Sequence, residues 1–203
     1  MYRELELLRR LKTTSSNSNS KSDEKPQYKF KIPLFGSQNT GKTSLILRYI
    51  KDTFKLNVKQ TIGTNFLIKD VEIKNAYVRL LLWDIGGQAQ FSTMRNIYFK
   101  GSQGAIGVYD ITAPESLLRL PGWVSTLKKS AGEVPLVLIG NKVDLAPDQR
   151  RVSKEDALDL AKRLDAKHFE TSAKTGENVE DMFLHVANMC YKIAKENEEA
   201  LAQ

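Results

Sequence analysis

Apolar and polar positions alternate along this chain with two different periods. Runs of period two, or short continuous apolar runs, predict strands, whereas apolar residues spaced three and four apart predict helices. Strands are expected at residues 28–35, 65–73, 77–83, 104–110, 135–140 and 167–171. Helical patterns begin near residues 42, 112, 153 and 176, and we expect five helices in all.

The connections between these segments predict how the strands pair. Only Lys74-Asn75-Ala76 joins the second strand to the third, so these two strands form an antiparallel hairpin. Beyond them strands and helices alternate, which predicts a parallel sheet covered by helices on both faces. The fold class is therefore α/β, with a six-stranded, mostly parallel sheet whose second strand is antiparallel, flanked by five helices.

Local signals mark three of the helices. Thr112 to Glu115 fits a capping box, and Ser153 caps a helix that runs through Leu164. Gly176 precedes the final helix, which has one apolar face and should bury it. That face carries Val179, Phe183, Val186, Cys190 and Ile193.

Composition divides the rest of the chain. Residues 1–12 have the pattern of a short amphipathic helix, and residues 13–26 are polar and Ser-rich, which predicts a flexible linker. The folded domain is expected at 27–197, with a short tail at 198–203. A helix of twelve residues is marginal alone in water. Three roles are open for it: a weak contact with a membrane surface, docking on the protein's own core, or binding a partner.

Charge and cysteine content narrow the class of protein. The 203 residues carry a net charge of +7 but no nucleic-acid-binding motif, so we expect no nucleic-acid partner. The single cysteine, Cys190, excludes an internal disulfide and indicates a reducing, cytoplasmic setting. It lies on the apolar helix face and is expected in the core. Trp83 and Trp123 are expected to be packing residues, and Trp83 could also face effectors. His168 and His185 lack ligand partners at zinc spacing.

One stretch carries the strongest chemical signal. A glycine-bounded loop links the first strand to a helix, and it fits a phosphate-binding P-loop. Its residues are Gly36, Ser37, Gln38, Asn39, Thr40, Gly41, Lys42 and Thr43, followed by Ser44. Backbone N–H groups and the helix N-terminus would face an anion, and Lys42 would reach the β- and γ-phosphates of a nucleotide. The Thr43 hydroxyl would bind Mg²⁺.

Three further segments follow predicted strands, where ligands bind in such sheets. Asp84 and Gly87 follow the third strand, so a carboxylate and a close backbone N–H would meet Mg²⁺ and a terminal phosphate. Alone, this segment also fits a helix cap with turn glycines.

The other two segments would contact the base of the nucleotide. Asn141-Lys142-Val143-Asp144 follows the fifth strand, and an Asp144 carboxylate can accept two hydrogen bonds from guanine that adenine cannot donate. Alone, this tetrapeptide is also a common polar loop. Thr171-Ser172-Ala173-Lys174 follows the sixth strand, and its small residues let the backbone approach the base.

Taken together in chain order, these segments resemble the Ras superfamily of small GTPases, with Rab-like proteins most similar. The resemblance covers about residues 28–195. Further Rab-like marks are Thr61-Ile62-Gly63-Thr64-Asn65-Phe66, Trp83-Asp84, Tyr98 to Ala105, Tyr109-Asp110-Ile111-Thr112 and Thr175 to Val179.

The resemblance implies a role for each matching position. Thr61 would sense the γ-phosphate through Mg²⁺, and Phe54 would lie against the guanine ring. Lys142 and Lys174 would flank the base, while Asn141 would tie its loop to the P-loop. Gln88 would orient the water that attacks GTP, with Lys42 stabilising the charge that develops.

The implied function is a monomeric switch that binds GTP or GDP with Mg²⁺ and hydrolyses GTP slowly. Exchange factors, activating proteins and effectors would contact the switch regions 54–66 and 84–100. A GTP-bound scaffold with little hydrolysis is the alternative, and an ATP-dependent enzyme is disfavoured by Asp144.

Several features of the sequence depart from the Rab-like pattern. Gln38 stands where many relatives carry a small residue, and its bulk near the γ-phosphate predicts low hydrolysis and a poor response to activators. Gly86 replaces the usual alanine, so Asp84-Ile85-Gly86-Gly87-Gln88 looks Arf-like. The chain lacks a C-terminal cysteine for a prenyl anchor, and Tyr2 excludes N-myristoylation, so we expect at most a peripheral membrane contact.

Overall fold

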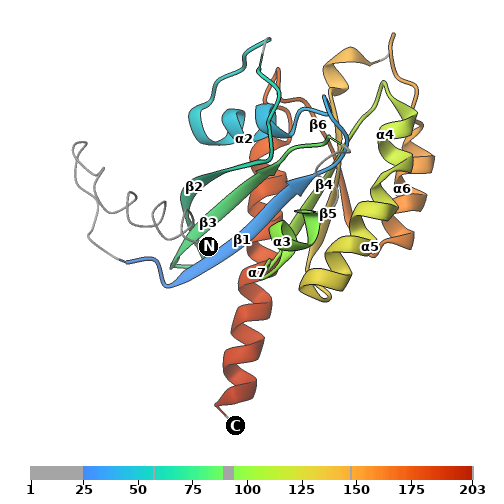
Figure 1. The fold of residues 1–203 in the computed structure, drawn as a ribbon. Helices are drawn as coiled ribbons and strands as arrows, with labels where there is room; N and C mark the ends of the chain where they lie inside the picture. The colour runs from blue at the N-terminus through green and yellow to red at the C-terminus, as the bar shows by residue number, and fades with distance from the viewer. Residues whose placement is uncertain (1–24, 57, 89–93, 147, 203) are drawn as a thin grey trace.

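The computed structural model describes residues 25–56, 58–88, 94–146 and 148–202. The predicted helix at 1–12 and most of the linker at 13–26 lie outside the described residues. Within these ranges the chain forms one six-stranded sheet with helices on both faces (Figure 1). The predicted fold class is confirmed.

The sheet has the strand order β2-β3-β1-β4-β5-β6. Only β2 runs antiparallel, against β3, and the other pairs are parallel, as predicted. Lys74 and Asn75 make the tight β2–β3 turn with φ of 49° and 66°. The strands are β1 (Tyr28–Phe35), β2 (Thr64–Ile73), β3 (Ala76–Ile85), β4 (Ala105–Asp110), β5 (Leu136–Asn141) and β6 (Lys167–Thr171).

The described helices form the predicted five helical units, because Arg119 alone separates two of them. They are α2 (Lys42–Lys51), α3 (Arg95–Phe99), α4 (Pro114–Leu118) with α5 (Leu120–Ala131), α6 (Lys154–Arg163) and α7 (Val179–Leu201). Buried apolar residues of α2 and α7 pack on one face of the sheet, and those of α3 to α6 pack on the other. Both β4 and β5 are wholly buried between these layers, as a continuous apolar pattern predicts.

Two cap predictions had opposite outcomes. Ser153 caps α6 by accepting a hydrogen bond from the Asp156 N–H at 3.0 Å, as predicted. The capping box at Thr112 is wrong. α4 begins after Ala113 without a side-chain cap, because the Thr112 hydroxyl instead donates to Asp110 Oδ1 at 2.7 Å.

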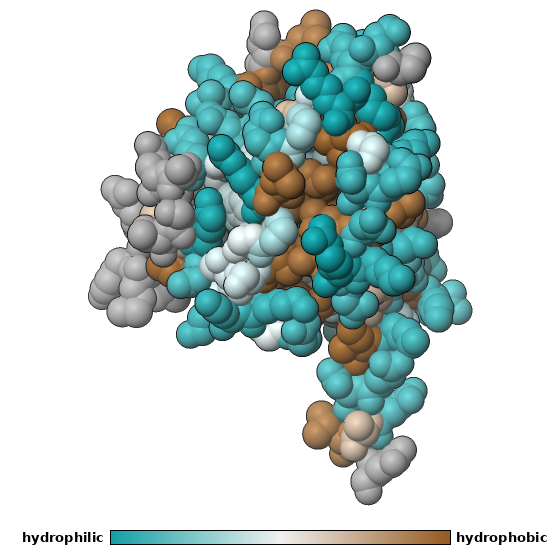
Figure 2. Space-filling model, turned by 90° about the vertical axis from the view of Figure 1, so that its right-hand side faces the viewer, coloured by the Kyte–Doolittle hydropathy of each residue, from teal (hydrophilic) through white to brown (hydrophobic). Residues whose placement is uncertain are grey.

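The final helix extends past the expected end of the domain. Four residues of its expected apolar face are buried, but Ile193 is 42% exposed. The reason is that the last turns of α7 project beyond the sheet (Figures 1 and 2), and the helix continues to Leu201, past the expected domain end at residue 197. Tyr28 of β1 steadies this extension by donating its hydroxyl proton to Glu198 at 2.9 Å.

Candidate functional site

A cavity of about 430 Å³ opens where β1, β3, β5 and β6 end. Segments far apart in the chain line it together. Of the predicted site residues, the cavity is lined by Gln38, Asn39, Gly41, Lys42, Thr43, Ser44, Phe54, Thr61, Gly87, Asn141, Lys142, Asp144, Ala173 and Lys174. Those outside its lining are Gly36, Ser37, Thr40, Asp84, Gln88 and Ser172.

The loop after β1 is shaped by two glycines. Gly36 and Gly41 have φ of 133° and 93°, in the region that favours glycine. A Cβ on Gly36 would overlap the Val108 carbonyl oxygen, and one on Gly41 would overlap the Asn141 side chain. The loop can therefore press against both β4 and the segment after β5.

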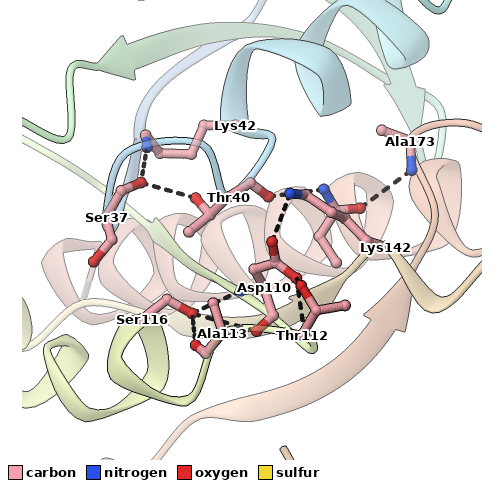
Figure 3. Close-up of polar contacts among 10 residues, drawn as sticks. Ser37, Thr40, Lys42, Asp110, Thr112, Ala113, Ser116, Lys142 and Ala173 are labelled. Carbon is pink, nitrogen blue, oxygen red and sulfur yellow. Dashed lines mark hydrogen bonds and ion pairs between the residues drawn. The ribbon is translucent and has the colours of Figure 1, made fainter. Parts of the chain in front are cut away.

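Lys42 folds back over this loop from the first turn of α2. Its ammonium donates to the Ser37 carbonyl oxygen at 2.7 Å (Figure 3). It also donates to the Gly36 carbonyl oxygen at 3.1 Å. Burial lowers the pKa of Lys42 to about 8, while the charge of Asp84 acts in the opposite direction. A buried cation beside the N-terminus of a ten-residue helix makes an electrostatic environment suited to a polyphosphate.

Three oxygen-bearing side chains meet beside Lys42. Thr43 and Thr61 both donate to Asp84 Oδ2, at 2.6 and 2.9 Å, and their hydroxyl oxygens lie 2.9 Å apart. Asp84 Oδ1 is buried and has no hydrogen-bond partner among the described residues. One carboxylate and two hydroxyls form a hard, oxygen-only donor set, which fits a Mg²⁺ ion that also binds phosphate oxygens and water.

The described residues offer no other metal site of the usual kind. They contain no group of three His, Cys, Asp or Glu side chains able to hold a metal ion. His168 instead shares a hydrogen bond with the Tyr109 hydroxyl at 3.0 Å, and Trp123 is buried in the core.

Asn141 joins three loops at the other end of the cavity. Its amide donates to the Thr40 carbonyl at 2.9 Å, and its Oδ1 accepts from the Ala173 N–H at 3.2 Å and the Thr171 hydroxyl at 3.3 Å. With 1% of its surface exposed, Asn141 is a buried amide whose oxygen and nitrogen are both hydrogen-bonded. The link to the P-loop that the family resemblance implied is present.

Asp144 is held at the cavity wall by its neighbours. The Ser172 hydroxyl donates to Asp144 Oδ1 at 2.6 Å, and the Lys174 ammonium lies 3.7 Å from Oδ2. Ser172 Oγ in turn accepts from the Thr175 N–H at 3.1 Å. Ser172 therefore acts behind the carboxylate and fixes its orientation.

The structure adds a residue to which the sequence assigned no role. Asp110, at the end of β4, accepts from the Thr112 N–H and hydroxyl through Oδ1 and forms an ion pair with Lys142 through Oδ2 (Figure 3). Lys142 has a φ of 74°, so its backbone conformation is also unusual. The motif Tyr109-Asp110-Ile111-Thr112 was visible in the sequence, but nothing local pointed to a partner after β5.

Arg48 is the second residue without an assigned role. From the third turn of α2 it donates to the carbonyl oxygens of Ala173 and Lys174, at 2.9 and 2.6 Å. A basic residue near the end of a helix is ordinarily solvated, so its position in the chain carries no signal for this contact.

The segment after β3 meets the cavity less completely. Gly87 lies so close to the P-loop that a Cβ there would overlap the backbone of Gly36, Ser37 and Gln38. The Gln88 amide donates to Gln60 Oε1 at 3.4 Å, and its side chain does not line the cavity. Residues 89–93, within the predicted second switch region, lie outside the described residues.

Comparison with known proteins identifies the family. The family model described as "Ras family" matches residues 31–192. The chain belongs to the Ras family.

Individual relatives agree with this assignment. "Ras-related protein Rab-21" of Bos taurus is 40% identical over 174 residues, which are 85% of this chain and 78% of the relative. The Homo sapiens protein of the same name is 39% identical over 85% of this chain and 77% of its own length. "Ras-related protein Rab-13" of Canis lupus familiaris is 38% identical over 159 residues, 78% of each chain. This Ras-family chain is therefore a Rab-like small GTPase that binds GTP, and the predicted superfamily and P-loop GTPase fold are confirmed.

Proposed function

We propose that this chain is a switch that binds GTP or GDP with Mg²⁺, hydrolyses GTP slowly, and changes the conformation of its two switch regions to control effector binding. The convergence of Lys42, Thr43, Thr61, Asp144 and Ala173 on one cavity is the main support. Vesicle trafficking is the proposed process, because the relatives are Rab proteins.

The phosphates would lie against the P-loop, residues 36–44. Lys42 and the N–H groups at the start of α2 would bind the β- and γ-phosphates. Thr43, Thr61 and Asp84 would hold Mg²⁺, and the buried unpaired Asp84 Oδ1 supports this assignment. When bound, the ion neutralises charge on the transferring phosphoryl group.

The base would lie between the segments after β5 and β6. Asp144 would accept hydrogen bonds from N1–H and the 2-amino group of guanine, and its rigid contact with Ser172 supports that orientation. Lys142 and Lys174 would flank the ring, and Phe54, which lines the cavity, would cover it.

Gln88 would place the attacking water, and Gln38 would limit the rate. Gln38 lines the cavity, and its backbone N lies against Gly87, where the second switch region reaches the γ-phosphate position. A long side chain at this point competes for space with the water, with Gln88 and with an arginine supplied by an activating protein.

Partners would bind at the two switch regions, 54–66 and 84–100. Ile62 is 77% exposed and Ile97 is 64% exposed, so each region presents apolar surface. No helix within the described residues is long and apolar enough to cross a membrane. We propose a cytoplasmic monomer, with residues 1–12 as the segment for any weak peripheral contact.

Single-turnover hydrolysis of bound GTP tests this proposal. We expect slow Mg²⁺-dependent hydrolysis, a rise of about threefold or more in Gln38→Gly and a fall of about tenfold or more in Gln88→Leu. Mass spectrometry of the nucleotide that co-purifies should show GDP or GTP. A protein that retains GTP and hydrolyses it equally slowly in all three forms is instead the GTP-bound scaffold.

A further inference from the structure

Arg48 makes four hydrogen bonds that none of the proposed nucleotide contacts require. Nε donates to the Ala173 carbonyl at 2.9 Å and Nη2 to the Lys174 carbonyl at 2.6 Å. Nη1 donates to the Asp52 carbonyl at 3.2 Å and to Asp52 Oδ1 at 2.9 Å. The Arg48 side chain is 17% exposed; its bond to the Ala173 carbonyl is partly buried, and the other three bonds lie at the surface. One guanidinium thus joins the base-binding loop, residues 171–174, to the end of α2.

The base-binding loop is held on its opposite side by Asn141. The Ala173 N–H donates to Asn141 Oδ1, and Asn141 donates to the Thr40 carbonyl. The base-binding loop is thus bonded to the P-loop through Asn141 and to α2 through Arg48, and α2 starts directly after the P-loop that contains Thr40.

The planar geometry of the peptide unit shows how Arg48 orients this loop. The peptide unit that contains the Ala173 carbonyl also contains the Lys174 N–H, and in a planar trans peptide the two point in opposite directions. Since the carbonyl points at Arg48, the Lys174 N–H points away from it. Arg48 does not line the cavity, whereas Ala173 and Lys174 do. Arg48 thus orients a backbone donor toward the base side of the loop.

The remaining contact reaches the start of the first switch region. Asp52 has a φ of 48° and ends α2, two residues before Phe54. Its side chain is 93% exposed, so the Arg48–Asp52 ion pair itself adds little stability. Asp52 and the base-binding loop therefore bond to the same guanidinium.

We propose that Arg48 is a positioning residue that fixes the Ala173–Lys174 backbone for the carbonyl at position 6 of guanine and couples this loop to Asp52. Arg48 then slows release of the nucleotide. This inference rests on the proposed guanine-binding function of the cavity.

The experiment measures dissociation of GDP and of 6-thio-GDP from the full chain, with the melting temperature of each GDP-bound variant. The sulfur of 6-thio-GDP is a weak acceptor, so the wild type should release it faster than GDP. Arg48→Gln should release GDP about tenfold faster or more, Arg48→Lys should be intermediate, and the ratio between the two nucleotides should shrink. Asp52→Ala should change GDP release by about threefold or less.

Arg79→Gln is the matched control. Arg79 makes two hydrogen bonds of 2.7 Å to Asp70 on the β2–β3 hairpin, and neither residue lines the cavity. We expect it to release GDP within about twofold of the wild type.

Two results would overturn the inference. One is wild-type GDP release from Arg48→Gln, or from Arg48→Lys where the glutamine variant does not fold. The other is an equal acceleration for GDP and 6-thio-GDP, which would make Arg48 merely structural. A wild type that binds neither nucleotide would instead overturn the proposed function, so the two failures are distinguishable.

Discussion

The two sides of the cavity are built differently. The base side is formed by the segments around Asn141 to Asp144 and Thr171 to Lys174, and the switch side is formed by the switch regions 54–66 and 84–100. On the base side, Asn141, Thr171 and Ser172 are almost fully buried. Thr171 donates to Asn141 at 3.3 Å, and Ser172 donates to Asp144 at 2.6 Å. On the switch side, Leu56 is 86% exposed, and the described contact between the two switch regions' glutamines is 3.4 Å long. The base side is thus held by buried hydrogen bonds, whereas the described part of the switch side includes strongly exposed side chains and this longer contact.

This difference suits a switch. A buried hydrogen-bonded network keeps its geometry, so the nucleotide can bind there with little reorganisation of the protein. Loops with few buried contacts change conformation at little cost, and a ligand shifts them by its differential contacts in the two states. The γ-phosphate and its ion would reach the loosely held side through Thr61 and Gly87.

We expect the largest effect on nucleotide affinity from replacing Asp144, on the base side. Replacement by asparagine turns one acceptor into a donor that faces guanine's own donors, so we expect Asp144→Asn to lose GTP affinity by about a hundredfold or more. The same change should create binding of xanthosine triphosphate, whose 2-oxo group accepts where guanine donates.

Equilibrium binding of both nucleotides to the wild type and the variant measures this exchange. Asp70→Asn, on the distant hairpin, is the control and should bind GTP like the wild type. Unchanged GTP affinity in Asp144→Asn would show that the carboxylate does not read the base.

The base side also shows which parts of the fold and the site could be predicted from the sequence. All six strands and the chemical segments were predictable, because local periodicity defines the strands and a parallel sheet brings their carboxyl ends to one edge. The contacts of Arg48 with Ala173 and of Asp110 with Lys142 were not. Each joins ordinary surface residue types that are far apart in the chain; in the first case Ala173 lies 125 positions after Arg48.

The failed capping box has a similar cause. Thr112 and Glu115 have the right spacing, but Asp110 lies two residues before Thr112 and competes for its hydroxyl. The outcome depended on the conformation at the end of β4, which the spacing alone does not contain.

An intermediate effect should follow from Gly86→Ala, which tests the switch side. A Cβ at this position would lie 2.7 Å from the Thr61 carbonyl oxygen and 2.9 Å from that of Gly63, so the backbone of the first switch region must move. Thr61 would then lose its place beside Asp84. We expect retention of Mg²⁺ with GTP to weaken by about five- to tenfold, with GDP affinity changed by less than about twofold.

Titration of Mg²⁺ against nucleotide dissociation, with GTP analogue and with GDP, separates the two expectations. Gly122→Ala is the control, because nothing lies within 4 Å of a Cβ there. If Mg²⁺ retention weakened equally with both nucleotides, a change on the switch side would also affect the base side, and the two sides would not be independent.

The smallest effect concerns Lys42, where the two sides meet. Burial lowers the pKa of Lys42 to about 8, whereas bound phosphates would favour the charged form and raise the pKa again. Binding therefore takes up a proton above about pH 8, and GDP affinity should fall about fourfold from pH 7 to pH 8.5. In Lys42→Arg the guanidinium stays charged across this range, so whatever affinity the variant retains should not change with pH. Calorimetry in two buffers of different ionisation enthalpy measures the proton uptake directly, and a wild type without uptake at pH 8.5 would show that Lys42 is already charged before the phosphates arrive.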